Sequence, residues 1–97
     1  MTPGTFTHHL SHSITKRAEF QRWAWESEAQ RDSTIGSFDE ADWPSRRAMC
    51  RRVILARCQI ESRSALLFDD LARAEFEQMV LEFNRATGGP YQKRKFA

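Results

Sequence analysis

The feature that most constrains the fold is an apolar stripe near the C-terminal end that repeats with the period of an α-helix. Its members are three or four residues apart for the most part: Phe68, Ala72, Phe76, Met79, Val80 and Phe83. Side chains at this spacing lie on one face of a helix, whereas a strand exposed on one face alternates every second residue. Gly88, Gly89 and Pro90 follow, and this combination is typical of a helix end. The stripe therefore predicts a helix that buries one face and ends near residue 88.

Two earlier segments also predict helices. The first covers residues 14–32, with two apolar sets on different faces: Ile14, Ala18, Trp25 and Ala29 on one, and Phe20, Trp23 and Ala24 on the other. After a single helical turn at 38–42, a second helix runs from about residue 43 to 61. Asp42 is suited to cap this helix, and Pro44 is tolerated in its first turn. Ser62 or Ser64 would cap the third helix, unless the second and third helices form one continuous rod.

These elements predict an all-α fold, a small three-helix bundle, in a chain of 97 residues. The helical domain is expected over residues 13–88. Residues 1–12 are expected to form a flexible N-terminal arm, because Pro3, Gly4 and several Ser and Thr residues have little helical propensity. Residues 89–97 are expected to form a basic C-terminal tail.

The charge pattern supports a hairpin of the second and third helices. Residues 43–63 contain six arginines and one glutamate, a net charge of +5, whereas residues 64–85 contain five acids and two arginines, a net charge of −3. Opposite charges that flank an apolar seam favour an antiparallel pair of helices. Each exposed pair contributes only about 0–1 kcal/mol, so the seam must supply most of the stability.

The spacing of the two cysteines indicates the cellular compartment in which the protein resides. Cys50 and Cys58, if both lie on one helix, are separated by about 12 Å of helical rise, which is too far for a disulfide. Reduced thiols favour a cytoplasmic location. No apolar run approaches the length of a membrane span, and the N-terminal residues lack the continuous apolar core of a signal peptide. We therefore expect no association with a membrane.

Exposed aromatic and cationic side chains are the candidate binding residues. Trp23 and Trp25 are about 200° apart on a helix, so one compact core cannot easily bury both from the same side. Either the second tryptophan packs under a loop or it anchors a partner, as exposed Trp and Arg do at binding hot spots. The candidate partner-binding residues, for protein or nucleic acid, are Trp25, Trp43, Arg46, Arg47, Arg51, Arg52, Lys93, Arg94 and Lys95.

Catalytic and metal-binding patterns have little support. His8 and His12 have a spacing that can bind a metal on a helix, but no Cys, Asp or Glu nearby completes a site. Asp69 and Asp70 diverge by about 100° on a helix, and no His lies near Cys50 or Cys58 in the sequence. We therefore predict no enzyme activity, no cofactor and no metal.

Two functions remain after these exclusions. The first is a protein–protein interaction module, such as an adaptor, an inhibitor or an accessory subunit, which acts through exposed aromatic and arginine side chains. A homodimer would suit so small a core. The alternative is a nucleic-acid-binding protein that uses the arginine-rich second helix and the basic tail. Its affinity would fall steeply with salt, because neutralised phosphates release counterions.

Overall fold

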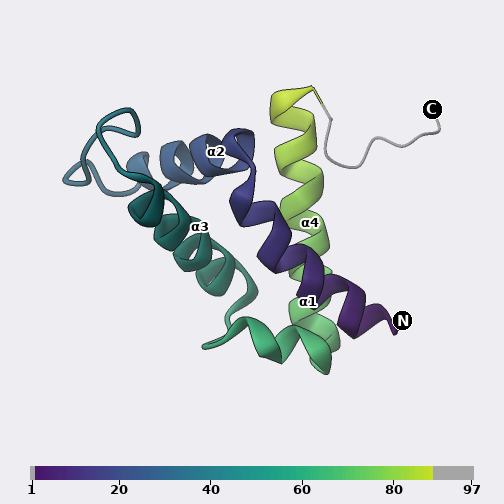
Figure 1. Ribbon diagram of the computed structural model, residues 1–97. Coiled ribbons are helices and arrows are strands. Elements are labelled where there is room, and N and C mark those ends of the chain that lie inside the picture. Colours follow the sequence, from purple (N-terminus) through teal and green to yellow (C-terminus); the bar gives the residue numbers. More distant parts are fainter. Residues whose placement is uncertain (1, 89–97) are drawn as a thin grey trace.

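The computed structural model describes residues 2–88, and all regular secondary structure in that range is helical (Figure 1). Four α-helices and two short 3-10 helices follow one another: α1 (Pro3–Ser13), η1 (Ile14–Lys16), α2 (Ala18–Ala29), α3 (Trp43–Cys58), η2 (Arg63–Leu67) and α4 (Asp70–Thr87). The predicted all-α helical bundle is confirmed. It contains one more α-helix than expected. None of the helices within residues 2–88 is both long and apolar enough to cross a bilayer.

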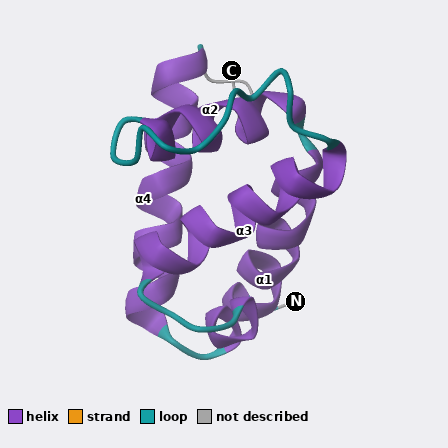
Figure 2. Cartoon of the chain, turned by 90° about the vertical axis from the view of Figure 1, so that its left-hand side faces the viewer, coloured by secondary structure: helices purple, strands orange, loops and turns teal. Residues whose placement is uncertain are grey.

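Helix α3 lies between two partners, since it packs against α2 on one side and α4 on the other (Figure 2). Helices α3 and α4 run in opposite senses, with η2 between them, as expected for an antiparallel hairpin (Figure 1). Helix α1 packs chiefly against η2. The three large rings at the centre belong to Phe20, Phe76 and Phe83, which are fully buried.

The segment expected to be a flexible arm is instead a helix. Helix α1 begins after Thr2, whose hydroxyl accepts a hydrogen bond from the Thr5 amide at 3.1 Å, and Pro3 occupies its first turn. Both residues are favourable at those positions, because Thr satisfies a free amide and Pro has none to satisfy. The expectation of an arm over residues 1–12 is therefore corrected.

Helix α1 is packed through small and hydroxyl-bearing residues. Its buried residues are Gly4, Thr7 and Ser11, and Thr15 in η1 continues the same face. Each of the three hydroxyls donates to a carbonyl three or four residues earlier, at 2.7–2.9 Å. Because these groups are hydrogen-bonded within their own helix, they can be buried without the cost of an unpaired polar group.

The helix predicted over 14–32 is shorter than expected. Ile14 is buried in η1, and the chain then turns at Arg17, whose extended backbone separates η1 from α2. Helix α2 ends at Ala29, before a loop that reaches Asp42. The loop folds back on α2, and Phe38 within it belongs to the buried core.

The ends of α3 and α4 show which expected caps form. Asp42 caps α3 by accepting from the Ser45 amide at 2.9 Å, as predicted. Gln59 adopts a left-handed conformation after α3, so the two helices are separate. Asp69, not Ser62 or Ser64, caps α4 through the Ala72 amide at 3.0 Å. Ser62 caps η2 instead.

The apolar stripe of α4 is buried as predicted, except at its first member. Ala72, Phe76, Met79, Val80 and Phe83 are all in the core. Phe68 precedes the helix and is 76% exposed, because α4 begins only at Asp70. At the other end, Gly88 has a φ of 89° and terminates α4, which confirms the predicted stop.

Candidate interaction surfaces

Trp25 does not belong to a surface. Its side chain is only 8% exposed, and its Nε1 donates to the Gly36 carbonyl oxygen at 2.8 Å. The indole also meets the Phe38 ring edge-on, with the centroids 6.2 Å apart. The indole therefore pins the loop onto α2, and the prediction of Trp25 as an exposed anchor is corrected.

Arg46 also holds this loop. Its Nε and Nη2 both donate to the Phe38 carbonyl oxygen, at 3.1 and 2.8 Å, and its guanidinium carbon lies 3.9 Å from the centroid of the Phe38 ring. Arg22 approaches the same ring at 4.5 Å. These contacts are a cation–π arrangement. They give Arg46 a structural role within the protein.

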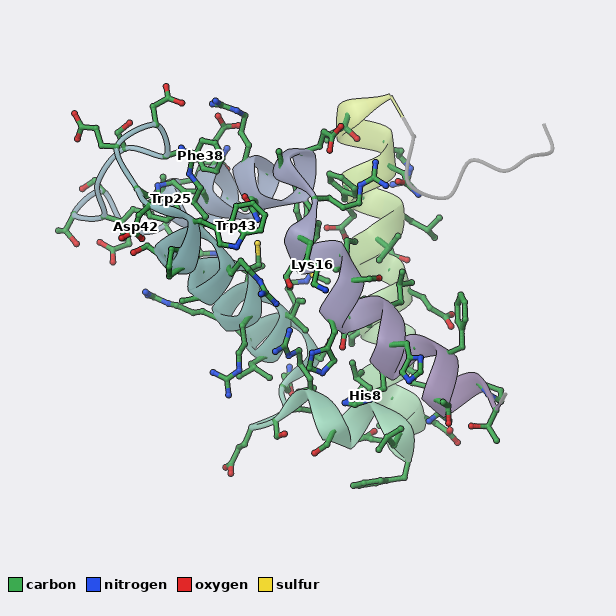
Figure 3. All side chains as sticks on the ribbon, viewed as in Figure 1. His8, Lys16, Trp25, Phe38, Asp42 and Trp43 are labelled. Atoms are coloured by element: carbon green, nitrogen blue, oxygen red, sulfur yellow. The ribbon has the colours of Figure 1, made fainter. Side chains whose placement is uncertain are left out.

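Trp43 is the predicted tryptophan that reaches the surface. It is the first residue of α3 and is 49% exposed. Trp43 lies with Trp25, Phe38 and Asp42 at one end of the molecule, and His8 lies toward the other (Figure 3). Its role in binding stays a prediction.

Arginines on α3 form ion pairs with both neighbouring helices. Arg57 makes a two-pronged contact with Glu82 of α4, at 2.8 and 3.1 Å, which is the expected attraction across the hairpin. This contact lowers the pKa of the Glu82 carboxyl, because the guanidinium donates hydrogen bonds to its ionised form. Arg52 instead reaches Glu28 of α2 at 3.1 Å. The basic charge of α3 is thus divided between two partners.

Arg47, Arg51 and Arg63 are among the arginines that make no ion pair within residues 2–88, and we call these three the cationic cluster. Arg47 and Arg51 are one turn apart on α3. Arg47 Nη2 donates to Thr15 Oγ1 at 3.3 Å, and its buried Nε has no hydrogen-bond partner. Arg63, at the start of η2, donates to the carbonyl oxygen of Ser11 at 3.3 Å. The cluster therefore joins α3, η2 and the end of α1.

Two histidines stand beside this cluster. His8 and His12 face each other on α1, with their Nε2 atoms 3.3 Å apart and their rings edge-on. Burial lowers the pKa of His12, and the nearby positive charge of Arg63 lowers it further. No group of three or more His, Cys, Asp or Glu able to hold a metal occurs within residues 2–88. The surrounding positive charge favours an anion over a cation here.

The two thiols are buried, Cys50 fully and Cys58 almost fully. Burial raises the pKa of Cys50 to about 12 and that of Cys58 to about 11. Thiols with raised pKa values are weak nucleophiles at neutral pH, because the thiolate is the reactive form. Lys93, Arg94 and Lys95, predicted to bind partners, lie outside the described residues.

Sequence reasoning missed an apolar surface on the outer side of α1, η2 and α4. Its large members are all at least 41% exposed: Phe6, Leu67, Phe68, Leu71 and Leu81. Phe6 and Leu81 line a groove of about 270 Å³ between α1 and α4, with Leu10 and Val80 in its walls. We call the five residues Phe6, Leu67, Phe68, Leu71 and Leu81 the apolar surface.

A second stripe on α4 carries part of this surface. Leu71, Ala74, Gln78 and Leu81 repeat every three or four residues and are all exposed, whereas the core stripe lies on another face. The spacing of Leu71, Ala74 and Leu81 was the available sequence signal. It was hidden because the stronger stripe of Phe76, Met79 and Phe83 runs through the same segment.

No family model, no curated protein and no solved structure matches this chain.

Proposed function

We propose that this chain is a small protein-binding module that docks a partner helix on the apolar surface. Leu71 on α4 is 81% exposed and Phe68 is 76% exposed, and these two exposures are the observation that carries the proposal. Single exposed apolar side chains are common on soluble proteins, but several on adjoining elements, two of which (Phe6 and Leu81) line a groove, are typical of an interaction site.

The periodic face of α4 indicates the form of the partner. Leu71, Ala74 and Leu81 present apolar side chains at helical spacing, which suits a partner helix that lies along α4. Phe6 lies at the edge of the groove beside this face and adds an aromatic contact. The partner is therefore expected to present an apolar stripe of its own.

The charges around the apolar surface indicate the sign of the partner's charge. Helix α4 contains four acids and two arginines. Glu77 lines the groove itself and is exposed. Lysine and arginine beside the partner's apolar stripe would be attracted to this side of the molecule. A second copy of the chain is a poorer occupant in a symmetric α4–α4 pairing, since it would bring acidic helices together.

The test is a double substitution, Leu71→Ser with Leu81→Ser. Both side chains are exposed, so the variant should keep its helical circular dichroism and its melting temperature. Capture from nuclease-treated host extract should yield a partner that binds the wild type, and the double variant should lose it. Ala48→Ser is the matched control, because Ala48 is exposed on α3, away from the apolar surface, and this variant should keep the partner. An unchanged set of captured proteins in the double variant would contradict the proposal.

A further inference from the structure

The cationic cluster brings three positive charges together, and none of them forms an ion pair with a carboxylate within residues 2–88. Arg63 reaches Ser11 and Arg47 reaches Thr15, and these two α1-face residues are one helical turn apart. Arg63 therefore approaches the backbone of Ser11 from η2, and Arg47 approaches the hydroxyl of Thr15 from α3, within the same short stretch of chain. The closest carboxylate along the chain, Glu61, makes no ion pair within residues 2–88.

These arginines use only part of their hydrogen-bonding capacity within the protein. Arg47 has a single hydrogen bond, to a hydroxyl that already donates to the His12 carbonyl oxygen, and its buried Nε has no acceptor. Arg63 has one 3.3 Å bond to a carbonyl. Burial lowers the pKa of Arg63, and the positive charges of Arg51 and Arg47 lower it further. Guanidinium groups in this state are favourable binding partners for an oxyanion.

We propose that Arg47, Arg51 and Arg63 bind a phosphate group at the junction of α1, α3 and η2. A phosphate carries up to two negative charges and offers several acceptor oxygens, so it matches more than one guanidinium at once. His12 stands at the edge of this site with a neutral ring at neutral pH, where a ring N–H can donate to the same anion. The inference is independent of the apolar surface, which lies on other residues.

The test is a titration with inorganic phosphate. Binding is monitored by the nuclear magnetic resonance signals of the His12 ring and of the arginine Nε groups. Sodium chloride replaces phosphate at constant ionic strength in the reference titration. The wild type should show saturable shifts with phosphate and none with chloride. Arg63→Gln should bind phosphate about tenfold or more weakly, the loss expected for one charged hydrogen-bonding partner.

Arg52→Gln is the matched control, because Arg52 is on the same helix but is paired with Glu28. It should bind phosphate as the wild type does. Should Arg63→Gln unfold, Arg51→Gln replaces it, since Arg51 is exposed and makes no ion pair within residues 2–88. Absence of saturable shifts in the wild type, or equal binding by the wild type and the folded cluster variant, would overturn the proposal.

A competition arm identifies the source of the phosphate. A short single-stranded oligonucleotide and a duplex are added to the phosphate-loaded protein. Displacement of phosphate by either one would support the site and assign it to the phosphodiesters of a nucleic acid. Saturable phosphate binding that neither one displaces would support the site and assign it to a free phosphate or a small phosphorylated molecule.

Discussion

Gly4 of α1 and Leu67 of η2 meet at a distance that only glycine permits. A Cβ atom on Gly4 would lie 2.8 Å from the carbonyl carbon of Leu67 and closer still to its oxygen. The obstacle is backbone, which cannot rotate away as the end of a side chain can. This contact sets how closely α1 approaches η2.

Gly4→Ala should therefore destabilise the protein. In an unobstructed helix this change would stabilise by about 0.5–1 kcal/mol, because alanine has the higher helical propensity. Here we expect a net loss of about 1–3 kcal/mol from overpacking, measured by urea unfolding. Gly36→Ala is the control, since its added Cβ meets nothing within 4 Å and its φ is not positive. A stabilised Gly4→Ala variant would show that α1 is not packed as described.

Trp25→Ala should cost about 3–5 kcal/mol in the free energy of unfolding, as expected for a large buried aromatic. Trp25→Phe should lose less, because it keeps most of the ring but leaves the Gly36 carbonyl without its indole donor. Trp43→Ala, at a half-exposed position, is the control and should cost much less. Denaturant unfolding of the three variants measures the differences, and equal losses for Trp25→Ala and Trp43→Ala would contradict the assignment.

Cys50 and Cys58 should resist alkylation in the folded protein. Both thiols are buried, and burial raises their pKa values to about 12 and about 11, so little thiolate exists at pH 8. Iodoacetamide labelling followed by mass spectrometry should show no modification until denaturant is added, and two modifications afterwards. Rapid labelling without denaturant would mean that α3 opens readily.

His12 should make the protein less stable in acid. Its pKa is lowered by burial first, and then by the positive charges of Arg63, His8, Arg47 and His9. The unfolded chain therefore binds the proton at higher pH than the folded protein does. The contribution of neutral His12 to the free energy of unfolding is complete above the ordinary imidazole pKa, about 6.5. It is lost as the pH falls through the lowered pKa of the folded protein.

His12→Gln should flatten the fall in melting temperature below about pH 6.5. His9→Gln is the comparison variant and should change the profile less, because His9 is exposed on the same helix and contributes least to the lowered pKa of His12. Thermal unfolding between neutral and mildly acidic pH gives the comparison. An identical pH profile in the wild type and His12→Gln would assign the acid sensitivity to other groups.

The sequence predicted the elements whose signals are local. The stripe of α4, the Asp42 cap of α3 and the stop at Gly88 each depend on residues within one or two turns. Helix α1 was missed because its buried face consists of Gly4, Thr7 and Ser11, which periodicity analysis counts as polar or neutral. Their burial depends on hydrogen bonds and on a close neighbour, neither of which apolar spacing records.

The cationic cluster could be predicted only in part, for a related reason. Arg47 and Arg51 are visible as a pair on one helix face, but Arg63 is in a connection and His12 was assigned to a flexible arm. The docking of α1 on η2 brings them together. Trp25 was a different case, because its spacing relative to Trp23 left open whether it packs under a loop or anchors a partner, and the loop through Gly36 and Phe38 covers it.

The small, hydroxyl-lined face of α1 has a consequence for motion. Undocking this helix would transfer fewer apolar atoms to water than opening α4, since its three buried residues are Gly4, Thr7 and Ser11 and its Leu10 is only partly buried. Its hydroxyls would keep their bonds to their own backbone while the helix moved. Amide hydrogen exchange should therefore be faster in α1 than in α4, which would make α1 the first part of the described chain to open below the global unfolding transition.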